Sequence, residues 1–398
     1  MRKLLVLLSA VAFVVAFTAP AMAADWGFYG NARMTTFMDD DSKEVTETDF
    51  GDDDLTWDLQ GNSRFGASVK AGDIGGGFEY GTGVNLRKLY GTWNFGGGTL
   101  LLGQTYSPVN MFYSNQVWGG DADMLPYGGV YGGRNPMIQL AMGSLKIALL
   151  KPKAPGGVLT AEVPEEFAQY SDEDLAELVE DEEWVLNTDY FIERTWDDQN
   201  LIFIPATAGI TEDTDTSMPK LEVSYSFKAG PVGLTVVGGY NTYDVVDTSN
   251  DKSYGIDSYI VGLGFNVGLG AAYIKGNVYT GTNLGPYGMW QEGADDPDYD
   301  ADTDSIKDCD SMGYLVVGGF KVSDTISLEA GYGHTESELD VAGSKADETD
   351  AYYVQATINL AKGCFIVPEI GKVDFKEDVD GEKQGETTYF GAKWQINF

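Results

Sequence analysis

The chain has little of what most enzymes and nucleic-acid-binding proteins need. It contains one histidine, two cysteines and 25 basic residues against 62 acidic ones, so its formal net charge is −37 over 398 residues. This charge argues against nucleic acid as a partner, because a phosphate backbone is bound through a basic surface. No paired nucleophile motif accompanies His334, the only histidine. We therefore expect no enzymatic activity.

Long apolar runs are also missing, except for one at the N-terminus. Two basic residues precede the apolar run Leu4–Phe17, and an A-x-A pattern ends at Ala23. This is the arrangement of a secretory signal peptide. We expect residues 1–23 to be removed, leaving residues 24–398 as one domain that is more negative by two charges. No later segment reaches the roughly 18 consecutive apolar residues of a membrane helix.

The chain has period-two alternation instead. In its last run Phe390, Trp394 and Ile396 fall on one face, and Tyr389 and Lys393 fall on the other. About sixteen runs of this kind follow one another, as in strands that stand between lipid and water. The pattern predicts an all-β fold: a transmembrane, antiparallel, up-and-down β-barrel of about 16 strands. Pro368 interrupts one run, which leaves 14 or 18 strands open.

The connections between these runs alternate between short turns and long loops. Long loops are expected at 107–136, 151–219, 280–311 and 336–350. In an outer-membrane barrel the long loops lie outside and the short turns face the periplasm. The connection near Gly81–Asn85 is the exception, because it is short where a long loop is expected. Within the acidic loop 151–219 a capping pattern predicts a short helix that begins near Ser171.

The two cysteines are separated by this topology. Cys309 falls in an outer loop and Cys364 beside a periplasmic turn. A hydrocarbon layer roughly 25 Å tall lies between those positions, whereas a disulfide needs Cα atoms within about 7 Å of each other. We predict no disulfide within the chain.

Arginine is scarce, and its few positions are informative. Of five arginines beyond the signal peptide, four lie in or beside predicted strands: Arg33, Arg64, Arg87 and Arg134. An arginine that faces lipid at membrane depth costs about 2–4 kcal/mol, so each is expected to face the lumen. From spacing alone they are either parts of one site or isolated lumen and rim residues.

Several segments resemble the general trimeric porins of Gram-negative bacteria. The first strand carries Phe28-Tyr29-Gly30, Arg64 precedes alternating small residues, and Trp118-Gly119-Gly120-Asp121 matches the family's FGGD-like motif. Gly132-Gly133-Arg134 then closes the third loop. The similarity covers residues 26–150 and the C-terminal strand, which ends on Phe398.

The resemblance implies a third loop that folds into the lumen and a charged constriction. It places Arg64, Arg87 and Arg134 on the wall, with Arg33 added by parity, and Asp121 and Asp123 on the loop. Alternation points Lys88 inward rather than Arg87, unless a bulge admits both. The resemblance also implies a homotrimer in the outer membrane, in contact with lipid and lipopolysaccharide. In such barrels the terminal Phe398 strand is recognised by the assembly machinery.

Together these features predict a porin for passive diffusion of small hydrophilic solutes and ions. We expect cation preference because the outer loops are acidic, moderated by the arginine wall. Two alternatives stay open: a substrate-specific channel, for example for phosphate or an organic acid, and a structural or adhesive barrel without conductance. Few basic residues lie on the candidate strands, which weighs against a channel specific for anions such as phosphate or an organic acid.

No cofactor or resident metal is expected. The aspartate-rich run 298–304 lacks the glycine and closing glutamate of an EF-hand. Weak binding of calcium or other divalent cations at the acidic loops remains an alternative.

Overall fold

The structure is a computed structural model, and it describes most of the chain. The described residues are 24–46, 52–159, 184–187, 190–193, 203–205, 212–248, 251–293, 295–300 and 303–398. The predicted signal peptide and the helix predicted to begin near Ser171 lie outside this part of the chain.

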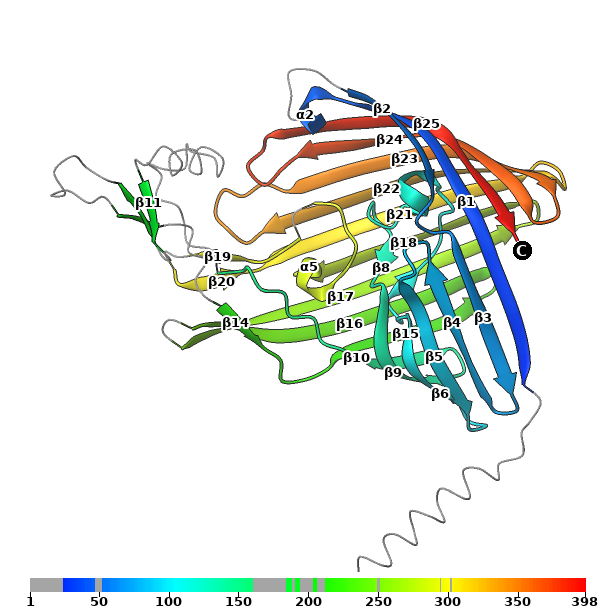
Figure 1. Cartoon of the computed structure of the whole chain (residues 1–398), viewed down its shortest axis with the longest axis horizontal. Helices are drawn as coiled ribbons and strands as arrows, with labels where there is room; N and C mark the ends of the chain where they lie inside the picture. Colours follow the sequence, from blue (N-terminus) through cyan, green and yellow to red (C-terminus); the bar gives the residue numbers. More distant parts are fainter. Residues whose placement is uncertain are drawn as a thin grey trace, which may run out of the picture.

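Most of the described strands belong to one antiparallel sheet that closes on itself as a barrel (Figure 1). It closes where the first strand, β1, pairs with the last, β25, from Asn31 opposite Asn397 to Asp41 opposite Thr387. The wall strands are β1 (Asp25–Asp41), β3 (Arg64–Ala71), β4 (Ile74–Gly81), β5 (Leu86–Asn94), β6 (Thr99–Tyr106), β9 (Arg134–Met142), β10 (Leu145–Leu150), β15 (Lys220–Ala229), β16 (Val232–Asp247), β17 (Lys252–Leu269), β18 (Ala272–Thr282), β21 (Cys309–Lys321), β22 (Ile326–Leu339), β23 (Asp347–Ala361), β24 (Cys364–Glu377) and β25 (Lys383–Asn397).

Two further segments extend wall strands rather than adding new ones. β2 (Asp52–Leu59) pairs with the second half of β1, and β3 pairs with its first half. β2 and β3 are therefore one wall position, broken at residues 60–63. In the same way β14 (Glu212–Asp215) and β15 both pair with β16. The 18 segments of the sheet thus occupy 16 wall positions, which confirms the predicted barrel and its strand number.

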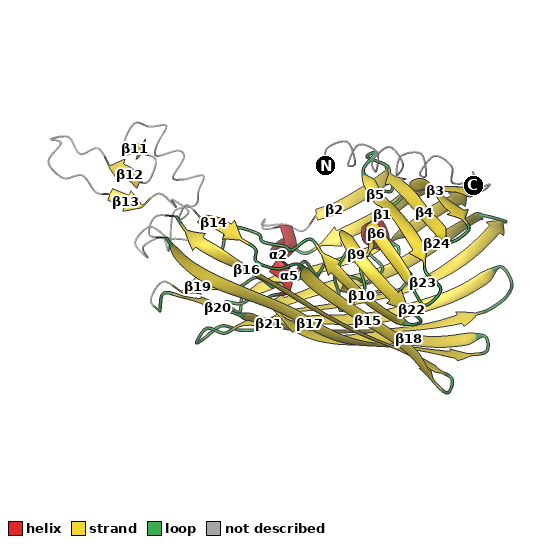
Figure 2. Cartoon of the chain, turned by 90° about the horizontal axis from the view of Figure 1, so that it is seen from below, coloured by secondary structure: helices red, strands yellow, loops and turns green. Residues whose placement is uncertain are grey.

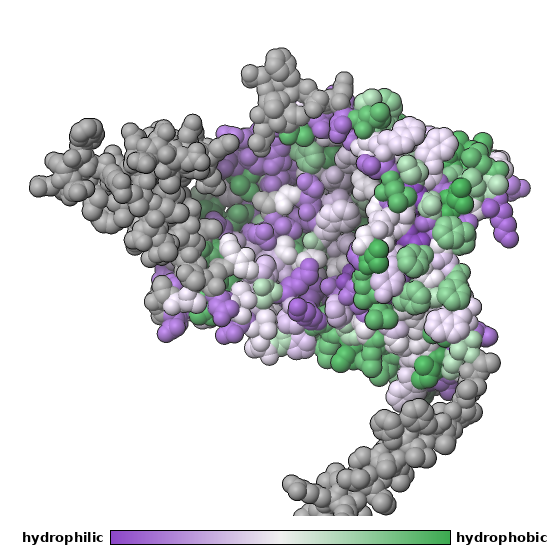
Figure 3. Space-filling view, in the orientation of Figure 1, coloured by the Kyte–Doolittle hydropathy of each residue, from purple (hydrophilic) through white to green (hydrophobic). Residues whose placement is uncertain are grey.

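The predicted alternation is observed along the wall. Phe390 is 56% exposed and Trp394 47% exposed, whereas Tyr389, which precedes Phe390 and lies on the opposite face, is 1% exposed. Apolar side chains gather on the outer surface over β1 and β3 to β6, at the right of Figure 3. This is the pattern of a wall that faces lipid outside and polar groups inside.

The connections also follow the expected alternation (Figure 2). Short turns join β3 to β4, β9 to β10 and β23 to β24. The connection between β4 and β5, residues 82–85, is also short, as the sequence predicts. Pro368 has no N–H to donate, and pairing between β23 and β24 skips its position while pairing with β25 continues. Cys309 and Cys364 begin β21 and β24 at opposite ends of the wall, and no disulfide joins them, as predicted.

The remaining elements are short, and several lie inside the barrel. The third loop, residues 107–133, carries β7 (Asn110–Met111), α3 (Trp118–Asp121) and β8 (Val130–Tyr131), and the loop after β18 carries α5 (Leu284–Tyr287). None of the helices in the described part of the chain is long and apolar enough to cross a membrane. The other short elements are α2 (Lys43–Thr46), β11 (Trp184–Asn187), β12 (Tyr190–Glu193), β13 (Phe203–Pro205), β19 (Asp298–Asp300) and β20 (Ser305–Lys307).

The register of the closing seam can be tested by cross-linking. Asn31 and Asn397 are direct partners across β1 and β25. The test uses an Asn31→Cys, Asn397→Cys variant in which Cys309 and Cys364 are replaced by serine. Its oxidation is expected to form a disulfide between the first strand, β1, and the last strand, β25. Opposed residues of an antiparallel pair lie within disulfide range. Non-reducing peptide mapping would detect the cross-linked peptide.

The matched control is Asn31→Cys with Ile396→Cys. This pair differs by one residue in register and places the two side chains on opposite faces of the sheet. Equal cross-linking of both pairs would contradict the described closure.

Candidate pore constriction

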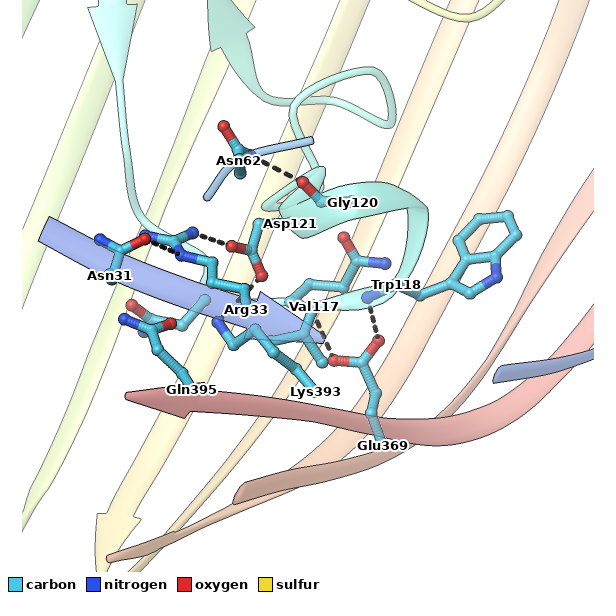
Figure 4. A network of polar contacts seen from close by, with 12 residues as sticks. Asn31, Arg33, Asn62, Val117, Trp118, Gly120, Asp121, Glu369, Lys393 and Gln395 are labelled. Carbon is cyan, nitrogen blue, oxygen red and sulfur yellow. Dashed lines mark hydrogen bonds and ion pairs between the residues drawn. The ribbon is translucent and has the colours of Figure 1, made fainter. Parts of the chain in front are cut away.

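Three glutamates of the wall hold the third loop inside the barrel. Glu222 Oε2 accepts a hydrogen bond from the backbone N–H of Val109 at 2.9 Å. Glu329 Oε1 accepts one from Asn115 at 2.8 Å. Both oxygens of Glu369 accept, from Val117 at 2.8 Å and from Trp118 at 3.1 Å (Figure 4). These bonds satisfy backbone donors that no strand pairs, as a buried loop requires.

Apolar packing fixes the same loop against the wall. The Trp118 ring stacks on Tyr389 with centroids 4.3 Å apart, and its Nε1 donates to Asp39 Oδ1 at 2.8 Å. Farther along, Met124 and Tyr127 pack with wall residues of β21, β23 and β24. At Gly333 any Cβ would lie 1.9 Å from the Tyr127 carbonyl oxygen, so the loop approaches a place where the wall has no side chain.

The break between β2 and β3 provides a further contact with the loop. Gly61 and Asn62 lie in the break, and Asn62 Nδ2 donates to the Gly120 carbonyl oxygen at 2.7 Å. Gly119 and Gly120 have φ values of 63° and 74°, a left-handed conformation that suits glycine. These two glycines turn the chain so that Asp121 points at the wall (Figure 4).

Asp121 lies between two basic side chains of the closing seam. It forms ion pairs with Arg33 of β1, through Nη1 and Oδ2, and with Lys393 of β25, through Nζ and Oδ1 at 2.9 Å. All three side chains are nearly buried. The structure thus places Arg33, predicted on the wall, against Asp121, predicted on the loop. Lys393 was not predicted, because only closure of the barrel brings the last strand beside the first.

Glu79 gathers a second set of cations on the neighbouring strands. Its side chain is 2% exposed and accepts from Arg87 Nε at 2.9 Å, with Lys88 Nζ at 3.2 Å and Arg64 Nη1 at 3.7 Å. Tyr29 also donates to it, at 2.9 Å. The β4–β5 register shifts at this point: Lys88 pairs with Glu79 and Leu86 with Tyr80, so Arg87 is the extra residue between them. This bulge explains how both side chains reach the lumen despite their adjacent positions.

Arg134 is held by an aromatic group rather than by an acid. Its Nη1 donates to Tyr106 Oη at 3.1 Å, and its guanidinium lies 5.3 Å from the centre of that ring. Tyr106 packs edge-to-face on Phe112 and Tyr131, and Tyr131 packs on Trp290 of the loop that carries α5. Trp290 was not predicted as a site residue. The mostly apolar segment 284–290, which precedes the acidic run 292–310, could have indicated a loop that folds inward.

One cavity of about 370 Å³ connects these groups. Six of the seven predicted site residues line it, and Lys88 is beside it through its pair with Glu79. The lining residues are Arg33, Gly61, Asn62, Arg64, Arg87, Tyr106, Phe112, Gly119, Gly120, Asp121, Asp123, Leu125, Tyr131, Arg134 and Trp290.

Asp123 has an unusual electrostatic environment in this cavity. Burial raises the pKa of its carboxyl to about 8, and the nearby Asp121 carboxylate adds to the shift, against the opposing effect of Lys393 and Arg33. At neutral pH the Asp123 side chain is therefore mostly uncharged.

The family model for Gram-negative porins matches residues 10–378, most of the chain. The chain belongs to the Gram-negative porin family. It is therefore an outer-membrane channel protein, and the expected localisation and family are confirmed.

Solved porins share the fold of this porin at low sequence identity. The outer membrane channel DcaP of Acinetobacter baumannii is 15% identical, over 94% of this chain and 97% of its own, with a TM-score of 0.64. OmpT of Vibrio cholerae in its trimer form is 14% identical, over 94% and 100%, with a TM-score of 0.52. An anion-selective porin from Comamonas acidovorans is 11% identical, over 94% and 100%, with a TM-score of 0.52. No curated protein matches the sequence.

The described part of this porin holds no group of three or more histidine, cysteine, aspartate or glutamate side chains arranged for a metal ion. Divalent-cation binding at the acidic loops stays a prediction. His334 Nδ1 donates to Asp350 Oδ1 at 2.8 Å near the long-loop end of β22, and the Tyr332 hydroxyl donates to the same oxygen. No nucleophile accompanies this pair among the contacts of the described residues, and the family is one of channels.

The raised pKa of Asp123 gives a testable pH dependence. Raising the pH from about 6 to about 10 passes through the Asp123 pKa and adds a negative charge to the cavity. Cation preference, measured as a reversal potential in planar bilayers, is expected to increase over this range. The Asp123→Asn variant is expected to lose that part of the change.

The matched control is Asp295→Asn. Burial also raises the pKa of Asp295, to about 7, but its side chain does not line the cavity. If the pH response survived Asp123→Asn and disappeared in Asp295→Asn, the titrating group would lie in the loop after β18. That result would contradict the assignment to Asp123 of the third loop.

Proposed function

We propose that this porin is a passive diffusion channel whose constriction is formed by the third loop and the wall around Asp121 and Glu79. The observation that carries the proposal is the cavity into which both charged clusters open. Fixed charges in a narrow, low-dielectric passage orient polar solutes and disfavour apolar ones. In this role Arg33, Arg64, Arg87, Lys88 and Arg134 supply the basic side and Asp121 supplies the charge on the loop side. Asp123 adds to it only above its raised pKa.

Cation preference at low ionic strength belongs to the same proposal. The acidic residues behind the net charge of −37 are most frequent in the predicted outer loops, and acidic outer loops repel anions that approach from outside. That field extends about 30 Å at 0.01 M salt and only about 3 Å at 1 M. The arginines of the cavity act at shorter range. Cation preference is therefore expected to fall as salt concentration rises.

A homotrimer is proposed as the working assembly. The support is the trimer form of OmpT among the similar structures. Contact with lipopolysaccharide, and recognition of the terminal strand by the assembly machinery, are proposed on the same family grounds. The exposed Phe398, whose backbone pairs with Gly30 of β1, is the terminal residue in question.

Reversal potentials test the channel and its preference together. Purified protein in planar bilayers is expected to conduct, with potassium preferred over chloride under a KCl gradient near 0.01 M. The preference is expected to weaken near 1 M.

Chloride preference at the lower concentration would contradict the charge argument. Absence of conductance from correctly folded barrels would instead favour the structural or adhesive alternative.

A further inference from the structure

The cavity carries more positive charge than its acids balance. Asp121 is shared by two cations and Glu79 by three. Among the ion pairs of the described residues, none joins Arg134 to a carboxylate. Asp123 lines the cavity, but its raised pKa leaves it mostly neutral near pH 7. An anion that enters the cavity therefore meets an excess of guanidinium groups.

The side of the cavity around Arg134 is aromatic. Phe112 and Tyr131 lie with ring centres 6.0 Å apart, and Tyr131 and Trp290 with centres 5.8 Å apart, all edge-to-face. Phe112 is 46% exposed and Trp290 43% exposed, although both belong to loops folded inside the barrel. Both residues line the cavity, so part of their exposed surface is open to it. Aromatic rings left open to water inside a lumen are positioned to contact a ligand's ring.

We infer that this cavity is a binding site for small aromatic carboxylates. The inference rests on the proposed channel function and adds a substrate class to it. Arg134 presents a planar fork of N–H donors that matches a carboxylate, and its described hydrogen bond to Tyr106 engages one nitrogen only. The ligand's ring lies against Phe112, Tyr131 and Trp290 while its carboxylate meets Arg134, with Arg87 and Arg64 nearby.

The geometry distinguishes this ligand class from two others. An inorganic anion uses the arginines but gains nothing from the rings. A neutral aromatic solute contacts the rings but leaves the excess positive charge unbalanced. The cavity volume, about 370 Å³, is in the range of about 300–1,000 Å³ usual for small-molecule sites.

The test uses benzoate, with acetate and benzyl alcohol as partial analogues. In planar bilayers at fixed KCl, benzoate is expected to reduce the single-channel current in a saturable way at neutral pH. Acetate has the charge without the ring, and benzyl alcohol the ring without the charge. Each is expected to need at least a tenfold higher concentration for the same reduction.

Variants then assign the site. Arg134→Gln and Trp290→Ala are each expected to weaken benzoate block by about tenfold or more, since each removes one half of the recognition. The matched control is Lys146→Gln, which removes an exposed lysine of β10 that does not line the cavity. This control is expected to leave block unchanged. Basal conductance and heat-modifiable migration on a gel report whether each variant is folded.

A binding measurement separates failure of the inference from failure of the proposed function. Calorimetric titration of benzoate into the purified protein in detergent does not require conductance. Conducting channels that benzoate neither blocks nor binds, or that acetate blocks equally well, would overturn the inference and leave the channel function intact. Binding without conductance would support the site and contradict the channel.

Discussion

A loop that lies inside a barrel has no neighbouring strand to satisfy its backbone N–H groups. In this porin the carboxylates of Glu222, Glu329 and Glu369 accept those hydrogen bonds from the third loop. A buried donor left without an acceptor costs about 1–3 kcal/mol, so several such bonds fix where the loop lies. The position of Asp121, and with it the shape of the cavity, depends on this set of contacts.

The irregular parts of the wall are found where the loop and the cavity meet it. The break between β2 and β3 brings Asn62 to the Gly120 carbonyl, and the bulge in β5 presents both Arg87 and Lys88 to Glu79. A regular strand offers only every second side chain to the lumen. These two departures therefore increase the number of polar groups around the cavity beyond what alternation alone supplies.

The strands of the wall could be predicted from the sequence because contact with lipid requires an apolar side chain at every second position of each strand. Every outward residue of a strand meets the same apolar surroundings, so alternation such as Phe390, Tyr389 and Trp394 is visible without knowledge of the fold. Contacts inside the lumen have no such periodicity. Lys393 is more than 250 residues from Asp121 in the chain, and Glu79 is one acid among many until β4 and β5 are paired.

The arginines were identifiable for a different reason. They are scarce, and their cost in lipid leaves the lumen as the favourable place. The break at residues 60–63 and the inward loop that carries Trp290 lacked a local signal of that strength. Both contact the third loop, through Asn62 and through Trp290 on Tyr131, and these contacts join segments far apart in the sequence.

The most direct test of the central claim is the single-channel conductance of a Glu329→Gln, Glu369→Gln variant. A glutamine keeps the shape but has one acceptor oxygen instead of two, so the loop is expected to leave its position and conductance to rise. The control, Glu338→Gln with Glu348→Gln, removes two charges near the ends of β22 and β23 and is expected to conduct like the unmodified porin. Unchanged conductance in a folded Glu329→Gln, Glu369→Gln barrel would contradict the account.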